Sequence, residues 1–290
     1  MEIIRANKMG FCFGVKGAIE SCYKYVEEIK KGKKVYILGM LVHNEHVVSQ
    51  LENLGLETVR EEDFMGDKVR FKPGDIVIVR AHGTKEEIYK KLEQQGVKIE
   101  DSACVFVKNI REKILELEKQ GDEIIFIGDR EHPEVQGIIS YGLNINIFKD
   151  LDELKKYSID AKKKYSLLTQ TTLNKEKMEE IKKYLENSHM NVKIFNKICG
   201  ATQERQEAVK KIAAETDLVL IVGGRKSSNT QKLFEISHKI NPNTKLVTDE
   251  TEVDLNWFSG CEKVGITAGA STPEDIIQKI ENKLRRNFNA

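Results

Sequence analysis

Short apolar runs alternate along the chain with longer segments in which apolar and charged positions recur at helical spacing. The apolar runs at positions 35–38, 76–79, 124–127 and 218–222 have the length of buried strands. The amphipathic segments include positions 107–119, 175–186 and 203–215. Strands that alternate with helices form parallel sheets covered on both faces. The pattern therefore predicts an α/β protein built from βα units.

The same pattern occurs three times. Cys104 and Cys199 each open a predicted helix that leads to a strand ending in glycine, 24 residues after the cysteine (128 − 104 and 223 − 199). A copy with longer loops begins at Cys12. Each copy also has a second strand end with a polar residue, 70, 67 and 72 positions after its cysteine: His82, Thr171 and Ser271.

The repeat predicts three similar α/β units that face one another around a pseudo-threefold axis and a central pocket. We place the units at residues 14–103, 104–198 and 199–290, the last together with residues 1–13. Ligands of open parallel sheets bind at the carboxyl ends of the strands. The three cysteines and the polar loops are therefore expected to converge.

Composition narrows the class of protein. Lys plus Arg (47) balances Asp plus Glu (46), which gives no global basic field for nucleic acid or a membrane surface. No apolar run approaches the roughly 18 residues of a membrane span. The first residues, MEIIRANKMG, do not resemble a signal peptide. We therefore predict a cytoplasmic chain with reduced thiols.

Three of the five cysteines have counterparts in the repeat. Cys12, Cys104 and Cys199 lie in loops of small residues at helix starts, a place that favours the thiolate. Cys22, on the apolar face of a helix predicted over 17–30, and Cys261 have no counterparts and are interpreted as buried apolar residues. C-x-x-C pairs typical of structural zinc are absent from the sequence. Three distant thiolates suit one [4Fe–4S] cluster per chain with one open iron.

Polar residues recur at the same strand ends. Together with helix N-termini they predict a cradle for phosphate or diphosphate; they are His43, His82, His132, Ser227, Ser228, Asn229 and Ser271. Glu134 follows His132 by two residues. It is either an ordinary acid at a helix start or, if a thiolate cluster lies near and raises its pKa, a proton donor.

Seven short motifs occur in a fixed order: GFCFGV (10–15), LVHN (41–44), AHG (81–83), HPEVQG (132–137), TQTT (169–172), KSSN (226–229) and TAGAST (267–272). The ordered set resembles the 4-hydroxy-3-methylbut-2-enyl diphosphate reductase (LytB) family over nearly the whole chain. Two departures stand out: DSACV (101–105) where the family usually has D-A-T-C-P, and Lys16-Gly17-Ala18 where a basic residue is commonly followed directly by Ala. Neither departure replaces one of the three cysteines of the repeat.

The resemblance implies three α/β domains in a trefoil-like arrangement that encloses a central iron–sulfur site, a [4Fe–4S] cluster held by Cys12, Cys104 and Cys199. It implies that the cradle residues named above contact the diphosphate, that Glu134 relays protons, and that Thr171 helps to hold the substrate hydroxyl. Thr172 is a weaker candidate. The implied reaction is reductive dehydroxylation of 4-hydroxy-3-methylbut-2-enyl diphosphate to isopentenyl and dimethylallyl diphosphate in the non-mevalonate pathway. Ferredoxin or flavodoxin is the expected electron donor, since no nicotinamide fingerprint occurs.

Two alternatives remain at this point. A quinolinate-synthase-like dehydratase is similar in having three α/β domains with one cluster cysteine each, and it needs no external electrons. A non-catalytic iron–sulfur or zinc sensor on the same units predicts no turnover and little need for a diphosphate cradle. A requirement for reductant separates the first alternative from the reductase, and turnover separates the second.

Overall fold

Three four-stranded parallel sheets form the frame of the computed structural model, which describes residues 1–158, 160, 162–188, 191–195 and 198–288. The first sheet has the order β3-β2-β4-β5, with bounds Glu57–Val59, Val35–Leu38, Ile76–Val79 and Lys98–Asp101. The second has the order β7-β6-β8-β9, with bounds Ile145–Phe148, Glu123–Ile127, Tyr165–Thr169 and Val192–Ile194. The third has the order β11-β10-β12-β1, with bounds Thr244–Val247, Leu218–Val222, Lys263–Ala268 and Glu2–Arg5.

One strand order therefore recurs in all three sheets, and the N-terminal strand β1 supplies the fourth strand of the third. Every strand pair is parallel, for example Ile37 beside Ile78 in the first sheet and Leu220 beside Ile266 in the third. The predicted α/β class with three repeated parallel sheets is confirmed.

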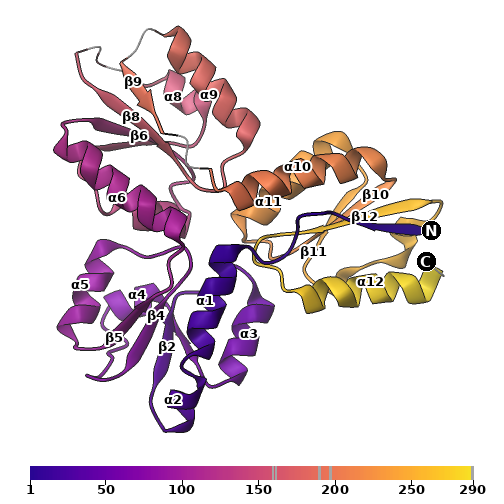
Figure 1. The fold of residues 1–290 in the computed structure, drawn as a ribbon, viewed down its shortest axis with the longest axis horizontal. Helices are drawn as coiled ribbons and strands as arrows, with labels where there is room; N and C mark the ends of the chain where they lie inside the picture. Colours follow the sequence, from indigo (N-terminus) through magenta and orange to yellow (C-terminus); the bar gives the residue numbers. More distant parts are fainter. Residues whose placement is uncertain (159, 161, 189–190, 196–197, 289–290) are drawn as a thin grey trace. The chain divides into compact units, whose positions relative to one another are not determined.

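Helices connect and flank the strands (Figure 1). Those that accompany the first sheet are α1 (Phe13–Tyr23), α2 (Val26–Lys30), α3 (Glu45–Asn53), α4 (Glu61–Met65) and α5 (Glu86–Gln94). The second sheet has α6 (Val105–Lys119), α7 (Pro133–Ile139), α8 (Leu151–Lys155) and α9 (Lys175–Asn187). The third has α10 (Gly200–Glu215), α11 (Ser228–Ile240), α12 (Glu274–Phe288) and the 3₁₀ turns η1 (Glu250–Glu252) and η2 (Leu255–Phe258). No helix among these described segments is long and apolar enough to cross a bilayer.

The helix predicted over residues 17–30 is wrong as a single element, because the chain breaks between α1 and α2. Tyr25 at the break is buried, and its hydroxyl donates a 2.7 Å hydrogen bond to the Glu100 carboxylate at the end of the first sheet. The Tyr25 backbone, with φ −102° and ψ 1°, departs from the helical conformation. Cys22 lies before the break and is fully buried, as predicted.

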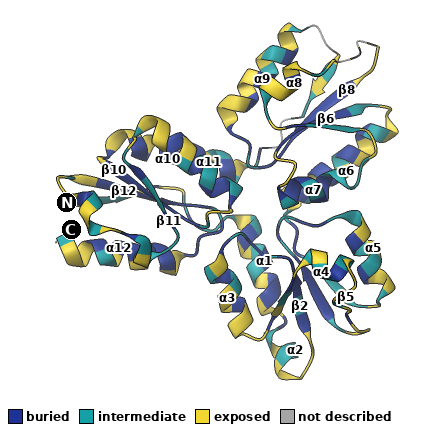
Figure 2. Ribbon diagram, turned by 180° about the vertical axis from the view of Figure 1, so that it is seen from behind, coloured by how far each residue is buried: buried dark blue, intermediate teal, exposed yellow. Residues whose placement is uncertain are grey.

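The central strands form the core, as the buried segments of the sheets in Figure 2 show. All four residues of β4 and all five of β10 are buried. Each fully buried Val, Ile or Leu side chain contributes roughly 1.5–3 kcal/mol relative to an exposed one. Continuous apolar runs, rather than alternating ones, follow from helices covering both faces of each sheet.

The chain divides into two compact units. The first comprises residues 1–16, 42–50 and 200–290, and the second residues 17–41 and 51–199. The segment after β2 that carries His43 thus belongs to the unit of the third sheet. The second unit contains the first two sheets. The division into three domains, with its boundaries, stays a prediction.

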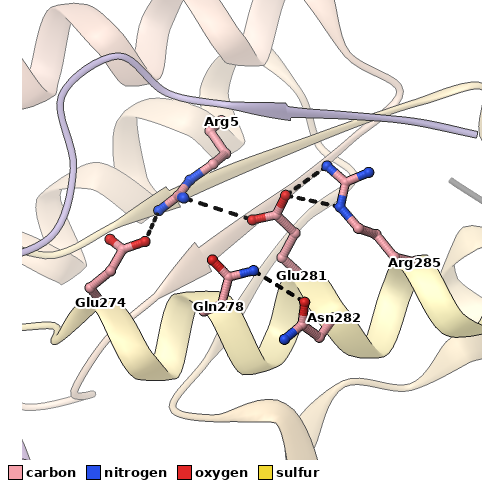
Figure 3. Close-up of polar contacts among 6 residues, drawn as sticks. All are labelled: Arg5, Glu274, Gln278, Glu281, Asn282 and Arg285. Carbon is pink, nitrogen blue, oxygen red and sulfur yellow. Dashed lines mark hydrogen bonds and ion pairs between the residues drawn. The ribbon is translucent and has the colours of Figure 1, made fainter.

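Charged side chains fasten β1 to α12 in the first unit (Figure 3). Arg5 pairs with Glu274, and its second terminal nitrogen lies 3.8 Å from Glu281. Glu281 is also held by Arg285 at 2.7 Å, and its side chain is only 9% exposed. A carboxylate that is nearly buried between two guanidinium groups is compensated for its lost hydration. The N-terminal strand is thereby fixed ahead of the loop that carries Cys12.

Candidate active site

The three sheets present equivalent loops at their carboxyl ends. A cradle residue follows the first strand of each repeat by five positions (43 − 38, 132 − 127 and 227 − 222): His43, His132 and Ser227. The third strand of each repeat is followed by a carbonyl that accepts the backbone N–H of a cysteine. These bonds join Cys104 to Ala81 at 2.9 Å, Cys12 to Ala270 at 3.0 Å and Cys199 to Thr171 at 3.1 Å.

This hydrogen-bond pattern shifts one predicted equivalence by a residue. The spacing pairs Thr171 with His82 and Ser271, whereas the backbone bonds make Thr171 the counterpart of Ala81 and Ala270. Thr172, which is half-buried, is the positional counterpart of His82 and Ser271. Counting from the cysteines was wrong by one because the intervening loops differ in length.

The cysteines predicted as ligands all lie at helix N-termini. Cys12 directly precedes α1, and its sulfur accepts the N–H of Val15 at 3.5 Å. Cys104 is the residue before α6, with extended backbone angles, and Cys199 directly precedes α10. All three are half-buried. Backbone N–H groups at a helix start can donate to a sulfur ligand, so each position suits a cluster ligand.

The other two cysteines lie in different surroundings. Cys22 is fully buried, and burial raises the pKa of its thiol to about 12. Cys261 is half-buried rather than buried, and burial again raises its pKa; its thiol donates to the Trp257 carbonyl at 3.8 Å. A thiol that resists ionisation is a poor metal ligand.

The first unit contains the predicted cradle residues of the His43 loop and of the third sheet. The Ser271 hydroxyl donates to the His43 carbonyl at 3.4 Å, and Ser227 caps α11 by accepting the N–H of Thr230 at 3.3 Å. Ser228 is half-buried in the first turn of α11. Asn229 is 5% exposed, and its amide nitrogen and oxygen have no hydrogen-bond partner among the residues described. Such a buried amide is costly unless a ligand satisfies it.

Gly224 determines how closely the His43 and Ser227 loops approach. A Cβ added at Gly224 would lie 2.3 Å from the His43 carbonyl oxygen, too close for any side chain. We therefore expect Gly224→Ala to force these loops apart and to lower the free energy of unfolding by about 1–3 kcal/mol. Denaturant unfolding measures this. Gly17→Ala is the control, because nothing lies within 4 Å of its added Cβ and helix α1 should gain stability; equal stability of both variants would contradict the expectation.

The second unit gathers the other histidines. His132 begins α7, and its Nδ1 accepts the N–H of Glu134 at 3.1 Å. Burial lowers the pKa of His132 to about 4, so the ring is neutral at physiological pH. With Nδ1 an acceptor, the proton lies on Nε2, which becomes a donor. The His82 ring stands edge-on to it, with 5.5 Å between centroids.

Glu134 is buried against Thr171. Its two carboxylate oxygens accept the Thr171 backbone N–H at 2.8 Å and the Thr171 hydroxyl at 2.7 Å. Burial raises the pKa of Glu134, and the two hydrogen bonds from Thr171 act in the opposite direction. The expected upward direction is found, although its cause here is desolvation. The same Thr171 offers its carbonyl to Cys199, which connects the acid to a predicted ligand loop.

Gln170 supports the loop before His132, a role that the sequence pattern did not predict. It is 5% exposed, and its side-chain oxygen accepts the N–H of Asp129 at 3.1 Å. The contact fixes the loop that leads to His132. The signal was present in the TQTT motif, where a glutamine directly after a buried strand is positioned at the ligand edge.

The unusual DSACV segment (101–105) holds Cys104, a predicted cluster ligand, in place. Val105 is exposed at the first position of α6, where a proline is tolerated but not required. The Ala103 N–H donates to Asp101 at 3.0 Å, which holds the turn before Cys104. The departure from the family pattern therefore leaves the backbone of Cys104 anchored.

Fold and site together define an α/β protein of three repeated parallel sheets whose strand ends carry thiol, imidazole and carboxyl groups. Residues 3–285 match the model of the LytB protein family. The chain belongs to this family.

The chain is similar to individual proteins that are named as diphosphate reductases. The 4-hydroxy-3-methylbut-2-enyl diphosphate reductase of Fusobacterium nucleatum is 53% identical over 285 residues, 98% of this chain and 34% of that protein, so the chain spans about a third of its length. The Aquifex aeolicus reductase of the same name is 36% identical, with 98% and 96% covered. The solved E-1-hydroxy-2-methyl-but-2-enyl-4-diphosphate reductase of Plasmodium falciparum has a TM-score of 0.91 at 29% identity, with 99% and 89% covered.

Proposed function

We propose that the chain catalyses reductive dehydroxylation of 4-hydroxy-3-methylbut-2-enyl diphosphate. Two electrons and two protons are consumed, the C–O bond breaks, one water leaves, and isopentenyl or dimethylallyl diphosphate forms. The observation that carries the proposal is the buried Glu134–Thr171 pair, joined through the Thr171 carbonyl to the Cys199 loop. This pair supports the proposal because a carboxyl group that can hold a proton then lies next to the loop of a proposed cluster ligand, in a member of the LytB family.

The proposed cofactor is one [4Fe–4S] cluster held by Cys12, Cys104 and Cys199. Thiolate donors at three helix starts fit such a cluster, and the shielded thiols of Cys22 and Cys261 do not compete. When bound, the cluster supplies electrons and a Lewis-acidic iron for the substrate hydroxyl. Ferredoxin or flavodoxin is the proposed donor, because the two electrons are proposed to arrive one at a time and the sequence has no nicotinamide-binding fingerprint.

The diphosphate is proposed to bind the polar strand ends. Neutral His132 donates through Nε2, as its occupied Nδ1 requires. Ser227, already accepting from Thr230, can donate its own hydroxyl proton, and the buried Asn229 amide supplies a further donor. His43, His82, Ser228 and Ser271 complete the proposed set. Hydrogen bonds to a charged ligand are the strong ones.

The proton is proposed to come from Glu134. A carboxyl group whose pKa is raised by burial holds its proton nearer to neutral pH, which suits a general acid. Thr171 orients it with two hydrogen bonds and is proposed to contact the substrate hydroxyl.

Anaerobic reconstitution with iron and sulfide, followed by assay of the diphosphate with a strong one-electron donor, tests the function. We expect a dehydroxylated product only when reductant is present. Turnover without reductant would favour a dehydratase, and a metal-loaded chain without turnover would favour a sensor.

Removing one cradle donor should weaken substrate binding. We expect Asn229→Ala, His43→Ala, His82→Ala and Ser271→Ala each to bind the diphosphate roughly 10–100-fold more weakly, the value of a hydrogen bond to a charged group. Calorimetric titration of the oxidised, cluster-loaded variants measures this. Ser259→Ala, at the end of η2 outside the predicted site, is the control. Unchanged affinity in all four site variants would refute the cradle.

A further inference from the structure

A buried arginine of α10 holds the loop that carries Cys12. Arg205 is 5% exposed, and its Nη2 donates to the Gly10 carbonyl at 2.7 Å. Its Nη1 donates to the Ala201 carbonyl, one helical turn earlier, also at 2.7 Å. Since a buried charge needs such partners, the two bonds fix the guanidinium in one orientation between helix and loop.

Gly10 has a backbone conformation that residues other than glycine rarely adopt. Its φ of +71° lies in the left-handed region that favours glycine, and its N–H donates to the Ala268 carbonyl at 3.4 Å. Two residues later the Cys12 N–H donates to Ala270. The third sheet therefore holds the loop through N–H groups, whereas Arg205 holds it through a carbonyl. The nearby Lys8–Glu204 ion pair at 3.5 Å joins the same elements, but it is exposed and contributes little.

We propose that Arg205 is a positioning residue for the iron–sulfur cluster. Arg205 lies on the helix that begins directly after Cys199, and it fixes the backbone two residues before Cys12. Its removal should therefore speed the release of iron from the chain. The inference rests on the proposed function, because the cluster belongs to that proposal. Arginine stays protonated in proteins, so the hold persists at any working pH.

The test compares Arg205→Gln, Arg205→Lys and Arg225→Gln with the wild-type chain. Arg225 is an exposed control that pairs with Glu252 at 2.8 Å. Iron per chain is measured after anaerobic reconstitution, then the rate of iron release to a chelator, and thermal unfolding of each metal-free chain. We expect Arg205→Gln to release iron at least about tenfold faster, the scale for a lost supporting partner of a metal ligand. Arg205→Lys should be intermediate, because lysine keeps the charge but lacks the fork that reaches two carbonyls.

Four results would count against the role of Arg205 or against the cluster itself. Iron release at the wild-type rate from Arg205→Gln overturns the inference, and so does an equal acceleration in Arg225→Gln. If the metal-free Arg205→Gln chain is unfolded at the assay temperature, a folded Arg205→Lys chain that releases iron at the wild-type rate overturns it. A wild-type chain that takes up no iron refutes the cluster itself, which is a separate result from any difference between variants.

Discussion

Cys12→Ser, Cys104→Ser and Cys199→Ser should each leave a folded chain that no longer holds the proposed cluster. The serine hydroxyl has nearly the shape of the thiol but stays protonated at neutral pH, whereas the thiolate is the metal ligand. Loss of a group that merely supports a metal ligand costs roughly 10–100-fold in metal affinity, so loss of a ligand should cost at least as much. Iron and sulfide analysis and the visible absorption of anaerobically reconstituted variants measure this.

Cys22→Ser and Cys261→Ser are the matched controls. Both thiols have pKa values raised by burial, and neither lies at the start of a helix of the repeat. Both controls should keep the wild-type iron content, although Cys22→Ser places a hydroxyl in a fully buried position and is expected to lower stability. A full cluster in any of the three site variants would show that the ligand set is wrong.

Much of the frame could be predicted from the sequence, because strand length and apolar runs are local signals. Strands β2, β4 and β10 begin and end at the predicted residues. The break before α2 was not predicted; it falls at Tyr25, whose hydroxyl bonds to Glu100, 75 residues away along the chain. Local helical spacing carries no record of such a contact.

In the candidate site, too, the sequence predicted the repeated residues but not their contacts with distant ones. Repeat spacing identified the three cysteines, because they occupy equivalent loops, yet it misplaced the counterpart of Thr171 by one residue, since only the backbone bonds fix that register. The partners of Glu134 and the buried Arg205 were not predictable, because both depend on contacts between elements far apart in sequence. Sequence spacing finds which residues recur; packing decides what each one touches.

Glu134→Gln should retain fold, cluster and substrate binding but lose turnover by roughly 10²–10⁴-fold, the usual contribution of a general acid. The amide oxygen can still accept the Thr171 N–H, and the amide nitrogen can donate to the Thr171 hydroxyl, which then turns its own hydrogen away. The buried pair thus stays hydrogen-bonded, but the side chain can no longer deliver a proton. Product formation under reducing conditions is measured alongside iron content and substrate affinity.

The pH profile separates the relay from a structural role. Turnover of the wild-type chain should fall as pH rises through the raised pKa of Glu134, because the carboxyl group then loses the proton it must donate. The glutamine variant should lack this limb of the profile. Glu131→Gln, an exposed neighbour in the same loop, should match the wild type. Near-normal turnover of Glu134→Gln would leave Glu134 as an acid that anchors α7 to Thr171, and a loss confined to substrate affinity would make it part of the cradle.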